Sequence, residues 1–506
     1  MHDGTLLAAV DLGSNSFRLE ISRLDHGRLH RVQYLKETVR QGNGLDADGR
    51  LTDEAMRRGW DCLARFGERL AGFDRPQVRA VATQTLREAV NREVFIQRGA
   101  QLLGFPIDVI SGPEEARLIY QGVAHLLLPS DERRLVIDIG GRSTELILGR
   151  QLAADTVASF PVGSVAWSQR FFPEGQFTAA AFDRAEVAAQ AVLEEALEAY
   201  PRSAWDTAYG SSGTAGAVGD ILTGMGGPAG LITRYGLDEL RDRLIRARNA
   251  DRLQLGALKE DRRPVIGGGV SVLRAVMRLL DIDQMTVAQG ALRQGVIYDL
   301  LDREHPQTDL RAATVSMLGR RFGVDAAQGA RVARVACALF GALLPPATAP
   351  DLRERMVRKL GWAAQLHEIG CLVSHSDSHK HGAYILDNTD APGFALPELH
   401  RLAQLVLGQR GKLRKVEAEL SDPIFLAMVV ALRIAVALCH ARRDPDLGGV
   451  ALAPLPRGGG WALAVQPAWE STFPQSLHLL REEALCWQRT PWRLDVVSAA
   501  RAALAR

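Results

Sequence analysis

The chain of 506 residues has few cysteines, and they are scattered without a CxxC pair. This pattern argues against a zinc site of the usual spacing and against a disulfide framework, and it fits a reducing compartment. The five cysteines are Cys62, Cys337, Cys371, Cys439 and Cys486.

The chain also lacks an excess of charge of either sign. Lys and Arg number 61, Asp and Glu number 59, and the formal net charge is +2. Proteins that bind nucleic acid usually carry a strongly basic surface, so no nucleic-acid partner is expected. If the substrate is a polyanion, the field that attracts it must be local to a cleft.

No apolar run is long enough to cross a bilayer. The most apolar segment, residues 425–439, is interrupted by Arg433. The N-terminus reads MHDGTLLAAVDLG and has no basic n-region, so we expect no signal peptide, no stable membrane insertion and a cytoplasmic protein. At about 150 residues per domain, the length predicts three or four domains.

What is present is one stretch that occurs twice, as AAVDLGSNSFRLEI and as LVIDIGGRSTELIL. In each copy an apolar strand ends in a Gly/Ser loop and a second strand follows. Such a loop gathers backbone N–H groups and hydroxyls into a nest for phosphate, and the aspartate is suited to holding Mg²⁺. The alternative is that these are two ordinary hairpins without a ligand, but matched residues at matched spacing favour a phosphate-binding role. The shared residues are Asp11/Asp138, Gly13/Gly140, Ser16/Ser143 and Leu19/Leu146.

The order of predicted elements indicates an α/β protein with additional helices. Three strands are followed by alternating helix and strand, which implies a mixed sheet flanked by helices, and the plan repeats from residue 134. From about residue 303 the chain is nearly all helical, and the Gly/Pro-rich run DPDLGGVALAPLPRGGG precedes a small α/β end. The predicted domains are 1–125, 126–303, 304–443 and 444–506.

Two more small-residue loops, YGSSGTAGA at 209–217 and VIGGGVSVLRAV at 265–276, each stand between a predicted strand and a predicted helix. Helix N-termini of this kind bind anions, which makes Ser212 and Gly213 candidates for phosphate contacts. Close backbone packing is the alternative for both loops.

The stretch SGPEEARLIYQGV predicts a helix with acidic residues in its first turn. Ser111 and Glu114 fit a capping box, with Pro113 in the first turn. Glu115 is then free to face a phosphate cleft, orient an attacking water and deprotonate it. The alternative is that both glutamates only complement the helix dipole.

Two further charged residues are candidates for the same cleft. Arg87, at the end of the predicted strand VRAVATQTLR, could clamp a phosphate oxygen or form a surface ion pair. Glu145 follows the second loop, where it could bind Mg²⁺ with Asp138 or face solvent.

A group of histidines in the helical part suggests a polar surface that could guide an anionic chain. The pair His367-Glu368 stands where a helical metal-dependent phosphohydrolase would have His-Asp, but no second aspartate follows at an obvious spacing, so a metal site is the weaker interpretation. The candidates for an anion path are His375, His379, Lys380, His381, Lys412 and Arg414.

Four motifs in order, DLGSNSFRL, ATQTLREA, ISGPEEARLIYQGV and DIGGRSTEL, resemble the bacterial exopolyphosphatase / guanosine pentaphosphate phosphohydrolase family. YGSSGT, GALRQGVIYDL and LHEIG…HSDSHKHGAYIL extend the resemblance over nearly the whole chain. It implies two actin-like, ribonuclease-H-like lobes with the active site between them, then a helical HD-like domain and a small C-terminal domain. It also implies Mg²⁺ as cofactor, K⁺ as a candidate activator and a homodimer.

The resemblance assigns roles to matching residues. Glu115 would be the catalytic base. Asn15, Ser16, Arg87, Gly140, Gly141 and Ser143 would bind phosphate, and Asp138 and Glu145 would support Mg²⁺ with Asp11 close by. Two positions depart from the family: Arg142 replaces a third glycine and either adds a phosphate contact or is merely tolerated. Ser164 stands where relatives often have cysteine, so a hydroxyl would do that job.

The function expected from these residues is removal of the terminal phosphate of inorganic polyphosphate by water, since the HSDSHKHGAYIL segment resembles the exopolyphosphatase branch more closely. The alternative is hydrolysis of the 5′-terminal phosphate of pppGpp to give ppGpp. Two further hypotheses are a sugar kinase or ATPase of the same fold, with VIGGGV as its adenosine pocket, and a non-catalytic alarmone sensor.

Overall fold

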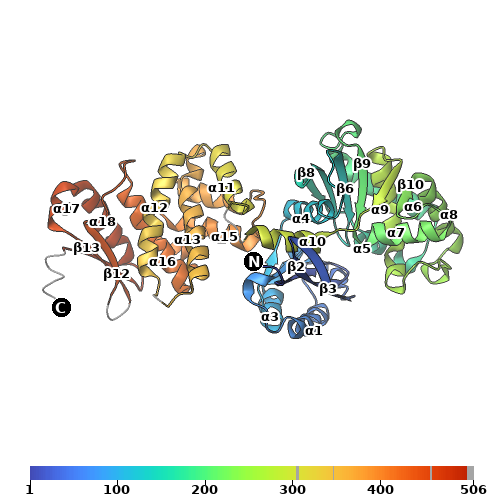
Figure 1. Ribbon diagram of the computed structural model, residues 1–506, viewed down its shortest axis with the longest axis horizontal. Coiled ribbons are helices and arrows are strands. Elements are labelled where there is room, and N and C mark those ends of the chain that lie inside the picture. Colours follow the sequence, from blue (N-terminus) through green and yellow to red (C-terminus); the bar gives the residue numbers. More distant parts are fainter. Residues whose placement is uncertain (304–306, 346, 456–458, 499–506) are drawn as a thin grey trace. The chain divides into compact units, whose positions relative to one another are not determined.

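The computed structural model describes residues 1–303, 307–345, 347–455 and 459–498 (Figure 1). The chain divides into two compact units, with the boundary between residues 309 and 310. The four predicted domain bounds remain a prediction.

The first lobe of the first unit is a five-stranded mixed sheet. The strand order is β3-β2-β1-β4-β5, with β1, β2 and β3 antiparallel and with β4 and β5 parallel to β1. The apolar run in β1 explains why this strand is central and buried. The strands are β1 (Leu6–Leu12), β2 (Phe17–Asp25), β3 (Arg28–Glu37), β4 (Val78–Ala82) and β5 (Ile107–Val109); the helices are α1 (Asp53–Arg69), α2 (Gln84–Glu88), α3 (Arg92–Leu103) and α4 (Gly112–Ala124).

The second lobe is a six-stranded mixed sheet with the order β10-β11-β9-β6-β7-β8. Its core is formed by apolar residues of the strands and of the helices that cover them, among them Phe182 and Val270. The strands are β6 (Arg133–Ile139), β7 (Thr144–Arg150), β8 (Ala153–Phe160), β9 (Thr207–Ser211), β10 (Leu231–Thr233) and β11 (Gln284–Val287); the helices are α5 (Ser164–Phe171), α6 (Ala179–Leu193), α7 (Ser212–Gly224), α8 (Arg234–Ala247) and α9 (Ile266–Leu279).

The repeated sequence forms the same local structure in both lobes. Leu12 pairs with Phe17 at the end of the β1–β2 ladder, and Ile139 pairs with Thr144 at the end of β6–β7. The loops left between them are residues 13–16 and 140–143. The predicted duplication of a strand–loop–strand unit is therefore confirmed.

Helix α10 (Leu292–Arg303) follows the second lobe but packs against α4, β1 and β4 of the first (Figure 1). The helices α4 and α10 cross in close contact at two glycines. A Cβ on Gly122 would lie 2.1 Å from the Ala291 carbonyl oxygen, and a Cβ on Gly295 would lie 1.8 Å from that of Leu118. This crossing fixes the position of α4, whose first turn carries Glu115.

The second unit is a group of helices followed by a three-stranded sheet, β12-β13-β14, with two helices. The most apolar helix of the described residues, α16 (Pro423–Leu438), is largely buried in this unit. Its Arg433 donates to Glu483 at 2.5 Å and to the Gly408 carbonyl at 2.7 Å, so the buried charge is paired. The elements are α11 (Leu310–Arg321), α12 (Ala326–Leu343), α13 (Pro350–Gln365), α14 (Ser378–Asp387), α15 (Leu396–Gly408), α16 (Pro423–Leu438), β12 (Val450–Pro454), β13 (Gly460–Val465), α17 (Pro467–Thr472), α18 (Pro474–Trp487) and β14 (Arg493–Ser498).

In the part of the chain that the structure describes, no helix combines the length and the apolar character needed to cross a membrane.

Candidate active site

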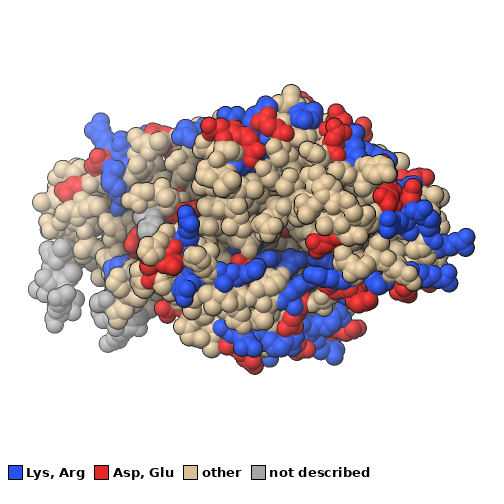
Figure 2. Space-filling model, turned by 45° about the vertical axis from the view of Figure 1, so that its right-hand side comes forward, with Lys and Arg blue, Asp and Glu red and all other residues tan. Residues whose placement is uncertain are grey.

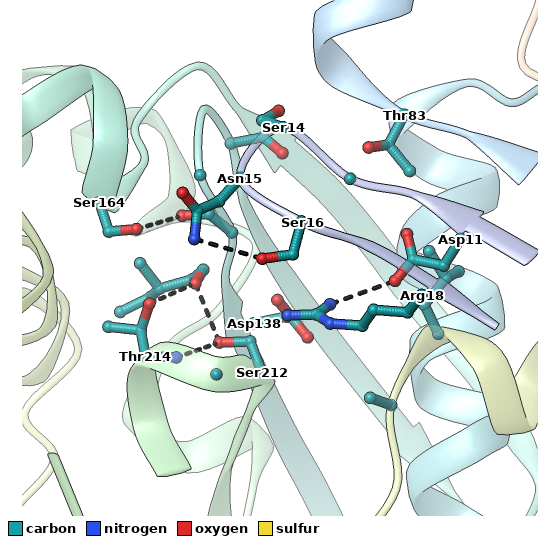
Figure 3. A pocket seen from close by; sticks show the side chains of 18 of the residues that line it. Asp11, Ser14, Asn15, Ser16, Arg18, Thr83, Asp138, Ser164, Ser212 and Thr214 are labelled. Carbon is teal, nitrogen blue, oxygen red and sulfur yellow. Dashed lines mark hydrogen bonds and ion pairs between the residues drawn. The ribbon is translucent and has the colours of Figure 1, made fainter. Parts of the chain in front are cut away.

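A polar pocket lies in the first unit, where the two Gly/Ser loops face each other (Figure 3). The loops are in van der Waals contact, because a Cβ on Gly141 would lie 2.9 Å from Cβ of Ser14. The lining residues are Asp11, Gly13, Ser14, Asn15, Ser16, Arg18, Thr83, Glu115, Ile119, Asp138, Ile139, Gly140, Gly141, Ser143, Ser164, Ser212, Gly213, Thr214, Arg262, Ala291, Leu292 and Arg293.

Hydrogen bonds hold both loops in shape. In the first loop, Thr85 Oγ1 donates to Ser14 Oγ at 2.7 Å. In the second, the Gly140 amide donates to the Ser143 carbonyl at 2.9 Å, and the Ser164 hydroxyl donates to the Gly140 carbonyl at 3.0 Å. Ser164 thus lines the pocket, and its hydrogen bond also stabilises the second phosphate loop.

The third small-residue loop closes the same pocket from the start of α7. Ser212 Oγ and Thr214 Oγ1 both donate to the Ile139 carbonyl, at 2.9 and 2.8 Å. Ser212 has φ of +77°, a conformation that costs a non-glycine residue energy and that often marks functional sites. The N-terminus of α7 lies at this loop, where a helix favours bound anions.

The VIGGGV stretch, in contrast, is a packing element. A Cβ on Gly267 would lie 2.7 Å from the Phe177 ring, and a Cβ on Gly268 would lie 2.4 Å from the Ser164 carbonyl oxygen. A Cβ on Gly269 would lie 2.9 Å from a methyl group of Thr214. The glycines therefore allow α9 to approach α5 and α7, and none of them lines the pocket. This geometry favours the packing alternative for the three glycines over a ligand loop.

Helix α4 presents Glu115 to the pocket. Ser111 Oγ accepts the Glu114 amide at 3.2 Å, which is the N-cap half of the predicted capping box, and the Glu114 carboxylate binds Arg117 at 2.8 Å. Arg87 Nη1 donates to Glu115 Oε2 at 2.7 Å. Arg87 lies in the short helix α2 and not on a strand, which corrects the predicted end of that strand.

Four carboxyl groups are gathered in and behind the pocket: Asp11, Glu115, Asp138 and Glu145. Burial and the nearby Glu115 raise the pKa of Asp138 to about 7. Burial also raises the pKa of Glu115, against the effect of Arg87. The pKa of Glu145 is raised well above its usual range by burial and by the charges of Glu115 and Asp138. Burial is the largest cause of the raised pKa in all three groups, and the three carboxylates of the lining face three arginines there, Arg18, Arg262 and Arg293.

This donor set fits a hard divalent cation that is completed by the substrate. Within the described residues, no three of the four carboxylates have ligand atoms within 4.8 Å of one another, so they do not form a closed protein cage. Mg²⁺ is commonly held by one or two carboxylates together with substrate phosphates and water. Asp138 and Asp11 both line the pocket, and their role in holding such an ion stays a prediction.

Three arginines in the lining were not anticipated. Arg18 Nη1 donates to Asp11 Oδ2 at 3.2 Å, and Arg293 Nε lies 3.3 Å from Glu20 Oε2. Arg262 reaches Gly213, since a Cβ on that glycine would lie 1.8 Å from Nη2. Burial and the charge of Arg18 lower the pKa of Arg262. On the face shown in Figure 2, Lys and Arg side chains gather along a hollow.

The comparisons with known proteins agree with this site. Residues 20–304 match the model of the Ppx/GppA phosphatase family, and residues 310–484 match that of Ppx/GppA phosphatase, domain III. The chain belongs to the Ppx/GppA phosphatase family. It is therefore a phosphoanhydride hydrolase, and the predicted fold class, with actin-like lobes, a helical domain and a small C-terminal sheet, is confirmed.

Two relatives that align with most of this Ppx/GppA chain are described as guanosine-5′-triphosphate,3′-diphosphate pyrophosphatases. The protein of Vibrio vulnificus is 37% identical over 97% of this chain and 98% of its own, and that of Vibrio atlanticus is 38% identical over 87% and 88%. A solved exopolyphosphatase from Cytophaga hutchinsonii is 27% identical, with a TM-score of 0.53, over 59% of this chain and 98% of its own.

Most residues predicted for the phosphatase site meet in the pocket. Those that line it are Asp11, Asn15, Ser16, Glu115, Asp138, Gly140, Gly141, Ser143, Ser164, Ser212 and Gly213. Glu145 lies behind the lining, where Ser159 donates to it at 2.8 Å. Arg87 stands behind Glu115. Their individual roles remain predictions.

Arg142 does not line the pocket. Its Nε donates to Glu88 Oε2 at 3.0 Å, and its Nη1 donates to the Gly42 carbonyl at 3.3 Å. Both partners belong to the first lobe, so Arg142 bridges the lobes beside the pocket. The replacement of the usual glycine is accommodated because the side chain points out of the phosphate loop.

The histidine group lies in the second unit. His379 is buried and contacts Lys415, while Lys380 lies 3.0 Å from Asp377. His367 is buried, with Nδ1 2.7 Å from the Ala364 carbonyl. The predicted polyphosphate path through His375, His379, Lys380, His381, Lys412 and Arg414 remains a prediction.

Proposed function

We propose that this Ppx/GppA phosphatase removes the 5′-terminal phosphate of pppGpp and releases ppGpp and inorganic phosphate. The observation that carries the proposal is that relatives described as guanosine-5′-triphosphate,3′-diphosphate pyrophosphatases align over 97% of the chain at 36–37% identity. The solved exopolyphosphatase covers 59% of it, at 27%. This reverses the order of preference that the sequence motifs favoured.

The pocket provides the parts that phosphoryl transfer to water requires. The N–H groups of the two loops and of the α7 N-terminus would surround the terminal phosphate, while Arg18 and Arg293 offset its charge. Asp138 and Asp11 would hold Mg²⁺, which when bound would neutralise charge on the transferring group.

Glu115 is placed to serve as the base. Arg87 holds Oε2, and no other hydrogen bond to this carboxylate is found among the described residues, so Oε1 can accept the proton of a water. The water oxygen would attack the terminal phosphorus, the bond to the bridging oxygen would break, and the proton would pass to Glu115. A raised pKa makes Glu115 a stronger base, and Arg87 favours its ionised form.

Inorganic polyphosphate is the second candidate substrate. It is supported by the solved exopolyphosphatase and by the basic residues of the second unit. The packing of VIGGGV argues against a kinase or ATPase, and the presence of Glu115, Asp138 and Arg87 argues against a non-catalytic sensor. Mg²⁺, K⁺, a homodimer and a cytoplasmic location remain predictions.

The test is a comparison of kcat/KM for pppGpp, long-chain polyphosphate and ATP under one set of conditions. We expect pppGpp to give the highest value. A higher value for polyphosphate would assign the chain to the second candidate, and turnover of ATP alone would contradict both.

A further inference from the structure

Tyr34 lies beside the pocket on the same face of the first sheet. It pairs with Glu20 across β2–β3, and Lys36 pairs with Arg18. Residues directly opposite in an antiparallel ladder share a face, so the ring of Tyr34 extends the row that begins with Arg18. The side of β3 that carries Tyr34 is tied to the second lobe by Lys36, whose Nζ lies 2.5 Å from Asp261 Oδ2.

The ring is exposed and surrounded by arginines. Tyr34 is 40% exposed. The Arg293 guanidinium carbon lies 5.0 Å from the ring centroid, and that of Arg31 lies 5.8 Å from it. Arg293 also lines the phosphate pocket. Tyr34 is close enough to Arg18 and to Arg262, two other arginines of the lining, to interact with them electrostatically. The ring is therefore continuous with the positive rim of the pocket.

Aromatic rings and guanidinium planes are the surfaces on which proteins stack nucleobases. A nucleotide whose terminal phosphate sits between the loops must direct its base out of the pocket, and inorganic polyphosphate has no ring to stack. We propose that Tyr34, with Arg31 beside it, is the stacking surface for the purine base, an inference that rests on the proposed function. Tyr34 then distinguishes a nucleotide from a phosphate chain.

The test compares two ligands that share phosphates and differ in the base. The dissociation constants of ppGpp and of tripolyphosphate are measured by calorimetry for wild type, Tyr34→Ala, Tyr34→Phe and Arg31→Ala. Tyr235→Ala is the control, because Tyr235 is 79% exposed on α8 and does not line the pocket.

We expect Tyr34→Ala to weaken ppGpp binding about tenfold, within the range for loss of one base-stacking side chain, and to leave tripolyphosphate binding unchanged. Tyr34→Phe keeps the ring and should bind like wild type. Unchanged ppGpp binding in Tyr34→Ala, or equal losses for both ligands, would overturn the inference. Failure of the proposed function is seen separately, as the absence of pppGpp turnover by the wild-type protein.

Discussion

Arg142 and Glu88 form an ion pair between the two lobes, with Nη2 2.9 Å from Oε2. Arg142 belongs to the second phosphate loop and Glu88 to the end of α2, so the pair spans the lobes next to the pocket. Both side chains are partly exposed, at 22% and 32%, which limits the strength of the pair to about 1 kcal/mol or less.

Arg142→Ala is expected to raise KM for pppGpp about two- to fivefold with little change in kcat, because the two lobes lose one contact beside the pocket. The effect should be smaller at high salt, where the ion pair is screened. Steady-state kinetics at two ionic strengths measures it.

Glu88→Ala separates the two interpretations of Arg142. If Arg142 acts through the ion pair, Glu88→Ala raises KM by a similar factor and the double variant adds nothing further. If Arg142 contacts phosphate, only its own replacement raises KM.

Glu115→Gln is expected to lower kcat at least about a hundredfold with substrate binding retained, since the amide cannot take the proton of the water. Steady-state kinetics with pppGpp measures kcat, and calorimetry with pppGpp measures the dissociation constant of the variant.

The matched control is Glu114→Gln in the same helical turn. Glu114 is 1% exposed and bound to Arg117, which keeps Asp299 as a second partner, so its neutralisation should destabilise the fold by roughly 1.5–3 kcal/mol. Turnover per folded molecule should persist. Loss of turnover in both variants to the same degree would remove the special role of Glu115.

Asp138 should make the stability of the metal-free protein depend on pH. Its pKa is raised from 3.8 to about 7 in the folded state, so the folded protein binds more protons than the unfolded chain between these values. The contribution of this group to the free energy of unfolding is therefore greatest below about pH 4. It falls as the pH rises from about 4 to about 7, by up to about 1.4 kcal/mol per pH unit, and levels off above.

Urea unfolding in EDTA between pH 5 and pH 8 measures this slope. Asp138→Asn should flatten it, and Mg²⁺ should restore stability mainly above pH 7. An equal slope in wild type and variant would show that Asp138 does not carry the effect.

Asp299 on α10 is expected to be essential for the stability of the first unit. It accepts from Arg117 and from Arg303 at 2.6 Å and also pairs with Arg79, and these charges hold its pKa far below the usual range. Asp299→Asn should destabilise by roughly 3–5 kcal/mol. Asp302→Asn, one turn further on, is the control in the same thermal unfolding experiment and should cost much less.

Much of the site could be predicted because it depends on local sequence. The loops after Asp11 and Asp138 need glycine and serine at fixed spacing, and the cap at Ser111 is set by its own helix. Arg18, Arg262 and Arg293 could not be recognised in this way, because the role of an arginine depends on partners distant in the chain. Arg262 lies in a short 3-10 helix (Glu260–Val265) whose sequence, EDRRPV, is polar and shows no apolar face.

The remaining differences also arise from tertiary contacts. The VIGGGV glycines could serve a ligand or a close helix crossing, and only the proximity of α5 and Phe177 decides for packing. From its position in the second loop, Arg142 could either contact phosphate or be merely tolerated, and the folded chain turns its side chain toward Glu88.

Chromatographic separation of the products formed from pppGpp by the wild-type protein and by Glu115→Gln, with Mg²⁺ and with EDTA, tests the central claim most directly. We expect ppGpp and inorganic phosphate in equal amounts from the wild-type protein with Mg²⁺, and neither from the variant nor in EDTA. Loss of the 3′-diphosphate, release of pyrophosphate or full activity of Glu115→Gln would contradict the proposed function or its base.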